Sequence, residues 1–393
     1  MAPSFKRIVE QFLLFVLPAN STASSEDSYA QNGLTWSSSA LRMNQIQVIG
    51  THNAYHREAT LAEQAYMSST MAGAQNLFYS HPSFDIQASY QSVRNFELDI
   101  YADPEGGHYA KPLIRANVST EPLPEMSDPG IKVLHIADVD YHTVCRTFKG
   151  CLKIVKKWSD AHPEHVPIPF MIEFKTAEAE VVALGGASII PWNNATLLKG
   201  LDEEIHSVFS DDQLIVPDDI RRGNLTLEKS VLQHGWPDLE SARGRVLFLM
   251  DNGPDHPVRD AYIKDRPNLE DRVIFTNSEP GKSDCAFQKL NDPTGDNQAN
   301  IRKQVKAGYW VRTRADEPIT TLLSDDVTGM RDAAFSSGAQ IVSTDFQAYG
   351  MSSRWEVDYA VSFKGGLAAR CNPIIAPDSC SDNQLENQDY IRE

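Results

Sequence analysis

The sequence lacks an excess of basic residues. Its 36 Lys and Arg are outnumbered by 53 Asp and Glu, which gives a formal net charge of −17 over 393 residues. Nonspecific binding to nucleic acid depends on basic side chains that neutralise phosphates, so we expect no nucleic-acid partner. The acidic balance is compatible with a cation held among carboxylates, although a soluble acidic surface accounts for the bulk charge equally well.

Long apolar runs are also missing. The short run Phe12–Leu17 follows Lys6 and Arg7 and is too short to span a bilayer, which is typical of a signal peptide. No later stretch has the length and polarity of a transmembrane helix. We therefore expect a secreted chain in which residues 1–40 are a signal peptide and flexible lead-in, and residues 41–393 form one catalytic domain.

Cysteine is scarce, and none of the five cysteines lies in a CxxC pattern of the zinc or redox type. Cys145 is close in sequence to Cys151, and Cys371 is close to Cys380. We expect these two pairs to form local disulfides and Cys285 to be left over. The alternative is five buried free thiols, but the secretion signal favours the disulfides.

Four positions match the acceptor pattern for N-glycosylation. They are Asn20, Asn117, Asn194 and Asn224. Each match alone arises by chance in many sequences. Together with the paired cysteines, they favour an N-glycosylated extracellular protein.

Short β-rich runs alternate with longer helix-compatible stretches along most of the chain. The eight candidate strands are Gln45–Thr51, Val93–Tyr101, Lys132–Ile136, Ile168–Lys175, Arg245–Asp251, Val273–Thr276, Trp310–Thr313 and Gln340–Thr344. Such alternation implies parallel strands with right-handed crossovers, and eight units predict an α/β fold of the TIM (β/α)8 barrel type. We expect a single domain with loop insertions, the largest over residues 189–235.

Polar side chains recur at the carboxyl ends of the predicted strands, where barrel enzymes assemble their active sites. His52 and Asn53 follow the first strand, Glu97 and Asp99 share one face of the second, and His135 ends the third. Two carboxylates on one face are costly to bury unless a cation neutralises them. Asn and carboxylate oxygens suit Ca²⁺, or less well Mg²⁺, and do not suit zinc.

The later strands add charge to the same mouth. Glu173 and Lys175 end the fourth strand, Arg314 follows the seventh, and Asp345 follows the eighth. Cations at such a mouth stabilise phosphate charge while two His move protons, so the set predicts phosphoryl chemistry. A single His or one Glu-x-Asp pair would be an ordinary structural or surface feature, and the prediction depends on their succession.

Other polar residues near these motifs have simpler explanations. We expect His56 to orient the first loop and His142 to be a surface residue. Asp138 and Asp140 are expected to cap the following helix, because Asp favours that position.

These motifs resemble those of the calcium-dependent phosphatidylinositol-specific phospholipases C, most closely the secreted microbial branch that consists of the catalytic domain alone. The matching segments are Gly50–His56, Glu97–Asp99, Val133–His135, Ile172–Lys175, Asp138–Cys145 with Cys151–Lys153, Trp310–Asp316 and Gly338–Asp345. The likeness runs from about Ile46 to the region of Cys371 and so covers most of the chain.

The resemblance implies a role for each matched residue. The catalytic pair would be His52 and His135. The Ca²⁺ ligands would be Asn53, Glu97, Asp99 and Glu173, with a role as a base left open for Glu173. The substrate contacts would be Lys175, Arg314 and Asp345.

The implied reaction is attack of the inositol 2-hydroxyl on the phosphorus of phosphatidylinositol, which yields diacylglycerol and a cyclic inositol phosphate. We assign His52 to accept the hydroxyl proton and His135 to protonate the leaving oxygen, and the reverse assignment stays open. None of the accessory modules of the large animal enzymes is visible. The barrel mouth therefore contacts a membrane surface transiently by itself or takes a soluble phosphodiester, and we expect a monomer.

Two other functions fit parts of the pattern. A glycerophosphodiester phosphodiesterase, or another secreted phosphodiesterase on the same barrel, shares the His, Glu-x-Asp and His motifs. Asn53 directly after His52, and Glu173 two residues before Lys175, favour the phospholipase C. A secreted binding protein on a degenerate barrel would lack part of the set, and no part is missing. A clear apolar stripe around the mouth is not evident from the sequence.

Overall fold

The computed structural model describes residues 28–391 except 116–122, 177–181 and 183–184. The predicted signal peptide and the glycosylation sequons at Asn20 and Asn117 lie outside the described residues. None of the helices in the described part of the chain is both long and apolar enough to cross a membrane.

Eight parallel strands form a barrel in the order β8-β7-β6-β4-β3-β11-β10-β9. Their bounds are β3 Ile46–Thr51, β4 Val93–Tyr101, β6 Ile168–Phe174, β7 Val246–Met250, β8 Ile274–Phe275, β9 Phe287–Lys289, β10 Trp310–Arg314 and β11 Ile341–Thr344. A parallel bridge between Asn277 and Phe287 links the two outer strands, so the barrel is nearly closed. The predicted TIM-type fold is confirmed.

One predicted barrel strand is wrong. The segment predicted over Lys132–Ile136 forms only the short strand β5 (Lys132–Val133), which pairs antiparallel with the end of β4. The eighth barrel strand is instead β9, and no helix separates it from β8. A three-residue strand without a preceding helix does not follow the strand–helix rhythm from which the strands were predicted. His135 therefore lies on the loop that follows β5, and β5 pairs with the end of β4.

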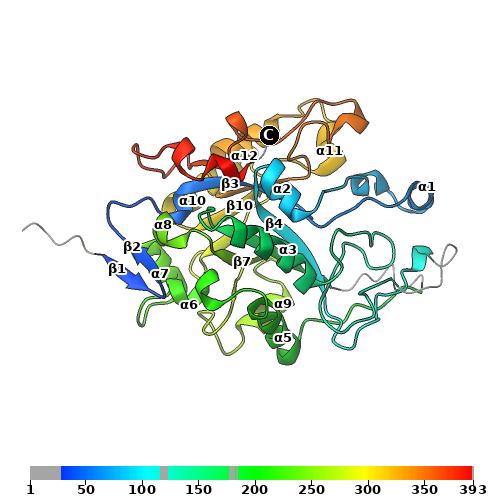
Figure 1. Ribbon diagram of the computed structural model, residues 1–393, viewed down its shortest axis with the longest axis horizontal. Coiled ribbons are helices and arrows are strands. Elements are labelled where there is room, and N and C mark those ends of the chain that lie inside the picture. The colour runs from blue at the N-terminus through cyan, green and yellow to red at the C-terminus, as the bar shows by residue number, and fades with distance from the viewer. Residues whose placement is uncertain (1–27, 116–122, 177–181, 183–184, 392–393) are drawn as a thin grey trace, which may run out of the picture.

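Helices cover the outside of the barrel (Figure 1). They are α1 Leu61–Thr70, α2 Phe84–Tyr90, α3 Phe148–Ala161, α5 Ala195–His206, α6 Pro217–Ile220, α7 Leu227–His234, α8 Leu239–Ala242, α9 Pro257–Ile263, α10 Asp296–Ala307, α11 Pro318–Leu322 and α12 Gly329–Ser337. The amphipathic pattern of α3 places Leu152, Val155 and Trp158 in the core. The expected insertion between β6 and β7 contains α5, α6 and α7.

Part of the expected flexible lead-in is ordered. Strands β1 (Tyr29–Gln31) and β2 (Leu34–Trp36) form a hairpin at one end of the molecule (Figure 1). Leu34 and Trp36 are buried in the main core, and the guanidinium of Arg222 stacks over the Trp36 ring. Burial of these apolar side chains stabilises a segment whose composition alone suggests flexibility.

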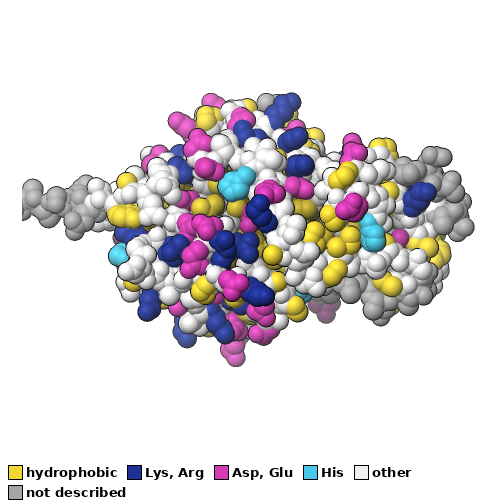
Figure 2. All heavy atoms as spheres, turned by 90° about the horizontal axis from the view of Figure 1, so that it is seen from below, with side chains coloured by type: hydrophobic (Ala, Val, Ile, Leu, Met, Phe, Trp, Pro, Cys, Tyr) yellow, Lys and Arg dark blue, Asp and Glu magenta, His cyan; other side chains and the backbone are white. Residues whose placement is uncertain are grey.

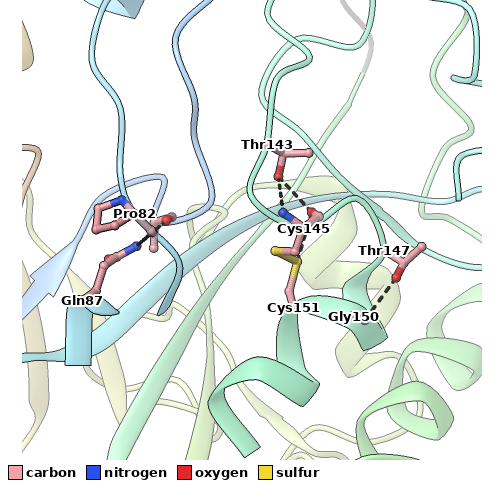
Figure 3. The surroundings of a disulfide bond; sticks show 8 residues. Pro82, Gln87, Thr143, Cys145, Thr147, Gly150 and Cys151 are labelled. Carbon is pink, nitrogen blue, oxygen red and sulfur yellow. Dashed lines mark hydrogen bonds between the residues drawn. A yellow bond between two sulfur atoms is a disulfide. The ribbon is translucent and has the colours of Figure 1, made fainter. Parts of the chain in front are cut away.

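Both predicted disulfides are present. Cys145 is bonded to Cys151 and Cys371 to Cys380, while Cys285 is a buried free thiol. Figure 3 shows the first of these bonds at the start of α3. This disulfide fixes the loop that returns from the barrel mouth to the helix.

Basic and acidic side chains are interspersed over the barrel body in the view of Figure 2, and hydrophobic side chains gather to one side of them. The acidic excess is therefore not collected into a single patch on this face.

The C-terminal segment closes the opposite end of the barrel from the mouth. Strand β12 (Ala369–Cys371) pairs antiparallel with β3. Farther on, Glu386 accepts hydrogen bonds from Arg94 at the start of β4, with Nε to Oε1 at 2.9 Å, and from the backbone of Val166 at 2.8 Å. Both charged side chains are almost completely buried. This ion pair is therefore expected to anchor the segment to the barrel.

Replacing Glu386 with Ala should destabilise the protein by about 3–5 kcal/mol, because it leaves the Arg94 charge buried without a partner. The free energy of unfolding in urea measures this loss. Asp389→Asn is the matched control, since Asp389 is exposed on the same segment, and should change stability by less than about 0.5 kcal/mol. Equal stability of the two variants would show that the buried pair does not anchor the segment.

Candidate active site

His52 is held by a buried carboxylate. Strand β3 runs beside β11, and the backbone N–H of His52 donates to Thr344 O at 3.0 Å, so His52 and Asp345 follow neighbouring strands. Asp345 is fully buried and lies 2.9 Å from Nδ1 of His52. A carboxylate accepts hydrogen bonds, so Nδ1 carries the proton and Nε2 is left available at the mouth.

The charge state of His52 follows from its surroundings. Burial and the positive charge of Arg314 lower the pKa of His52 to about 3, despite the attraction of Asp345. His52 is therefore neutral at neutral pH, and its Nε2 can accept a proton. Nε2 lies 3.9 Å from Oε1 of Glu97.

Arg314 and Asp345 do not project into the mouth. Arg314 donates to Asp345 at 3.2 Å, and only 8% of its side chain is exposed. Asp345 lies behind His52. The structure therefore places both residues, which were predicted to contact substrate, behind His52.

His135 is held by a second buried carboxylate. Its Nδ1 lies 2.8 Å from Oδ2 of Asp140, and the same oxygen lies 2.8 Å from Nε2 of His56. The other ring nitrogen of His56 lies 3.0 Å from the backbone oxygen of Tyr79. Both partners of His56 are acceptors, so His56 carries two protons and a positive charge.

The pKa directions agree with this arrangement. Burial lowers the pKa of His56, but the charge and hydrogen bond of Asp140 outweigh burial and raise it above the usual value. Burial also lowers the pKa of His135, with partial compensation by Asp140. The pKa of Asp140 itself falls well below its usual range because the two imidazoles outweigh its burial.

Asp140 is not a helix cap, so that prediction is wrong. Helix α3 begins at Phe148 and is capped by the side chain of Thr147. Asp138 also serves another purpose, because it accepts backbone hydrogen bonds from Leu113 and Ala187. The side chains of both Asp residues bond to groups in the loops around the mouth and not to the first turn of α3.

Three carboxylates gather near the carboxyl ends of β4 and β6. Asp99 on β4 is the direct neighbour of Glu173 on β6, and Glu97 is two residues before Asp99, so all three point to the same face. Each offers an oxygen within 4.8 Å of the other two. Lys175 Nζ lies 3.2 Å from Asp99 and 3.3 Å from Glu173. Arg312 donates to Glu97 from the opposite side of the barrel.

These carboxylates are buried at an energetic cost. Burial, followed by repulsion from Glu173, raises the pKa of Asp99 well above its usual value. Burial also raises the pKa of Glu97 to about 7, against the attraction of Arg312. The nearby basic side chains therefore do not fully neutralise the cluster, and an additional cation would stabilise it.

The donor atoms fit Ca²⁺. Oδ1 of Asn53 and Oδ1 of Asp99 are buried without a hydrogen-bond partner. Asn53 adopts a left-handed backbone conformation with φ of 45°, which Asn tolerates, and its Nδ2 donates to Tyr79 Oη at 3.1 Å. The amide is thereby oriented with its oxygen unsatisfied. Asn and carboxylate oxygens are ligands that Ca²⁺ prefers.

Sequence reasoning missed several residues around this site. Tyr79 contacts both Asn53 and His56, yet it lies between predicted elements and carries no motif. Lys289, which pairs with Asp251 at the end of β7, was missed because β9 was missed. The sequence contains one indication of the pairing of Asp140 with His, because Asp140 follows His135 in a His-x-x-x-x-Asp spacing. This spacing is weak evidence for a contact when both residues lie in a loop.

Comparisons with known proteins agree with this geometry. The chain matches the family model described as phosphoinositide phospholipase C, Ca²⁺-dependent, over residues 41–373. No curated protein matches the sequence.

Solved structures of bacterial enzymes are similar to this chain. One is a calcium-dependent phosphoinositol-specific phospholipase C from a Gram-negative Pseudomonas species in a myoinositol complex. Its sequence identity is 17% and its TM-score 0.51, over 84% of this chain and 95% of that chain. Another is a Ca²⁺-dependent phosphatidylinositol-specific phospholipase C from Streptomyces antibioticus, with 17% identity and a TM-score of 0.48 over 81% of this chain and 98% of that chain.

At this identity, the Pseudomonas structure supports the barrel fold alone. The family match carries the further conclusion, because residues 41–373 are most of the chain and include both His–Asp pairs and the carboxylate cluster. The chain therefore belongs to the Ca²⁺-dependent phosphoinositide phospholipase C family.

Proposed function

We propose that this protein is a secreted phosphodiesterase that cleaves phosphatidylinositol to diacylglycerol and a cyclic inositol phosphate. The observation that carries the proposal is the pair of imidazoles, His52 and His135, each oriented by its own buried Asp on either side of a carboxylate cluster. Two proton-transfer groups beside a cation site are what displacement at a phosphodiester requires.

The proposed cation is Ca²⁺, and its ligands would be Asn53, Glu97, Asp99 and Glu173. Bound Ca²⁺ supplies positive charge that acidifies a hydroxyl and stabilises phosphoryl oxygens. Lys175 lies beside Asp99 and Glu173 and would add a second positive charge toward the phosphate.

The geometry supports one assignment of the two His. His52 is neutral, and its Nε2 is unprotonated, so it accepts the proton of the inositol 2-hydroxyl as the oxygen bonds to phosphorus. The bond from phosphorus to the diacylglycerol oxygen breaks, and that oxygen takes a proton from Nε2 of His135. His135 must be charged before this step. Burial lowers the pKa of His135 and opposes the charged form, whereas the hydrogen bond between its Nδ1 and Asp140 favours it.

Asp345 and Arg314 would act through His52. Because both are buried behind the ring, we assign Asp345 a positioning role in place of the predicted contact with substrate. Arg314 would hold Asp345 in place and keep the pKa of His52 low.

Secretion is part of the same proposal. The two disulfides are typical of an oxidising compartment. Of the four glycosylation sequons, Asn194 and Asn224 lie within the described residues and are exposed, so both are accessible to modification.

Phosphorus NMR of the products from phosphatidylinositol tests the reaction. With Ca²⁺, a cyclic inositol phosphate should form, and excess chelator should abolish it.

His52→Ala and His135→Ala should each lower kcat by about 10²- to 10⁴-fold, because each removes a proton-transfer group. His206→Ala is the control, since His206 is an exposed residue on α5, and should keep full activity. Cleavage of glycerophosphocholine with no action on phosphatidylinositol would favour a glycerophosphodiesterase instead.

The positioning role of Asp140 has a matched control in Asp138, a buried Asp on the same loop whose side chain accepts hydrogen bonds from the backbone of Leu113 and Ala187. Asp140→Asn removes the acceptor shared by the two imidazoles, so kcat should fall by about 10²- to 10⁴-fold while KM changes little. Asp138→Asn should reduce the melting temperature but preserve kcat. If the two variants had the same kcat, Asp140 would have only a structural role.

A further inference from the structure

Two arginines and one histidine converge on a pocket at the amino end of the barrel. Arg42 precedes β3, Arg222 follows α6, and His234 ends α7. The pocket has a volume of about 300 Å³, and Tyr29 and Trp36 of the β1–β2 hairpin belong to its wall. The remaining lining residues are Ser28, Ser38 and Gln233. We call this site the basic pocket.

The charge of the basic pocket is not balanced by acidic side chains. Among the described residues that line it, none is Asp or Glu, and neither Arg42 nor Arg222 forms an ion pair with a described carboxylate. Burial lowers the pKa of Arg222, Tyr29 partly opposes this effect, and the charge of Arg42 adds to it. Burial, followed by the charges of Arg222 and Arg42, lowers the pKa of His234. The three side chains therefore repel one another's positive charge.

Ring stacking holds the guanidinium of Arg222 in place. Its central carbon lies 3.9 Å from the centroid of the Tyr29 ring and 4.6 Å from that of Trp36. The Trp36 ring is itself fixed, because its Nε1 donates to the backbone oxygen of Gly235 at 3.0 Å. Nε and Nη2 of Arg222 are buried without a hydrogen-bond partner. Stacking thus orients the guanidinium without using its N–H groups.

Arg42 is held by the backbone at the end of α7. Its Nη1 donates to the backbone oxygens of His234 and Trp236, each at 2.8 Å. Within the described chain, Nε and Nη2 of Arg42 donate to no other group. Both arginines are therefore positioned by contacts that leave N–H groups available for a ligand.

Other arginines with largely buried side chains are neutralised by carboxylates. The pairs are Arg94 with Glu386, Arg259 with Asp284, Arg312 with Glu97 and Arg314 with Asp345. The chain has 53 Asp and Glu and a net charge of −17, so acidic partners are abundant. The basic pocket is a local exception on this acidic protein, and an external anion would relieve its repulsion.

The basic pocket is far from the catalytic mouth. The mouth lies at the carboxyl ends of the barrel strands, whereas Arg42 lies just before the amino end of β3. Figure 1 shows the β1–β2 hairpin beside α6 and α7, at the end of the molecule opposite to α1. A ligand in this pocket would therefore not compete with substrate, and the inference is independent of the proposed function.

We propose that the basic pocket binds the phosphate group of a small soluble molecule, either inorganic phosphate or a phosphate monoester. Guanidinium N–H groups match phosphate oxygens and form charge-assisted hydrogen bonds with them. Phosphate oxygens point to the corners of a tetrahedron, so one phosphate can bond Arg42, Arg222 and His234 from different directions. A planar carboxylate offers fewer such directions.

Isothermal titration calorimetry with inorganic phosphate, at constant ionic strength and in excess chelator, tests the proposal. The wild type should bind one phosphate per chain at this pocket. Arg222→Gln and His234→Gln should each bind at least about tenfold more weakly, because each removes a charge-assisted hydrogen bond. Lys229→Gln is the matched control, since Lys229 is an exposed cation on α7 outside the lining, and should bind like the wild type.

Two further titrations separate the pocket from the mouth and identify the form of the ligand. Lys175→Gln should keep full phosphate binding, and loss of binding in this variant would place the phosphate at the mouth and overturn the proposal. Glycerol phosphate should compete with inorganic phosphate, and the tighter of the two identifies the preferred form. Equal phosphate binding by Arg222→Gln, His234→Gln and the wild type would refute the pocket. Binding of dextran sulfate without any binding of phosphate or glycerol phosphate would also refute it.

Discussion

Burial of carboxylates at the barrel mouth is the constraint on which the rest of the site depends. Glu97, Asp99, Asp140 and Asp345 are each at most 2% exposed. An isolated buried carboxylate is strongly unfavourable, so each must be paired or neutralised. Asp140 and Asp345 are paired with imidazoles and keep pKa values below the usual range, whereas the pKa values of Glu97 and Asp99 are raised. Asp140 and Asp345 therefore orient the two imidazoles, whereas Glu97 and Asp99 need a cation to neutralise their charge.

This separation has a functional consequence. Asp345 follows β11 and Asp140 lies on the loop after β5, so the two His are held from different parts of the barrel. Each ring keeps one nitrogen fixed by its Asp and presents the other nitrogen near the cluster. Such rigid orientation favours proton transfer to and from a substrate held between them. The same mouth loop continues to Tyr141 and His142, which both donate to Glu63 and so attach α1 to this loop.

The sequence was sufficient for the fold and the family. It also predicted that Glu97, Asp99 and Glu173 lie together, because parallel strands bring their carboxyl ends together, whereas Arg314 and Asp345 lie buried behind His52. It predicted β4 with its bounds and the shared face of Glu97 and Asp99. It could not reveal β9, which is three residues long, or that β5 pairs antiparallel and carries His135 on a loop. The partners of Asp140 depend on contacts between loops that are distant in sequence, which no local pattern encodes.

The central claim is that the buried carboxylates require a divalent cation, and isothermal titration calorimetry of the metal-free protein with Ca²⁺ tests it directly. The account predicts one Ca²⁺ per chain and loss of that binding in Asp99→Asn, which removes a buried ligand without changing its size. Asp389→Asn, an exposed position far from the mouth, should bind like the wild type. Absence of Ca²⁺ binding to the wild-type protein, or equal binding by Asp99→Asn, would contradict the claim.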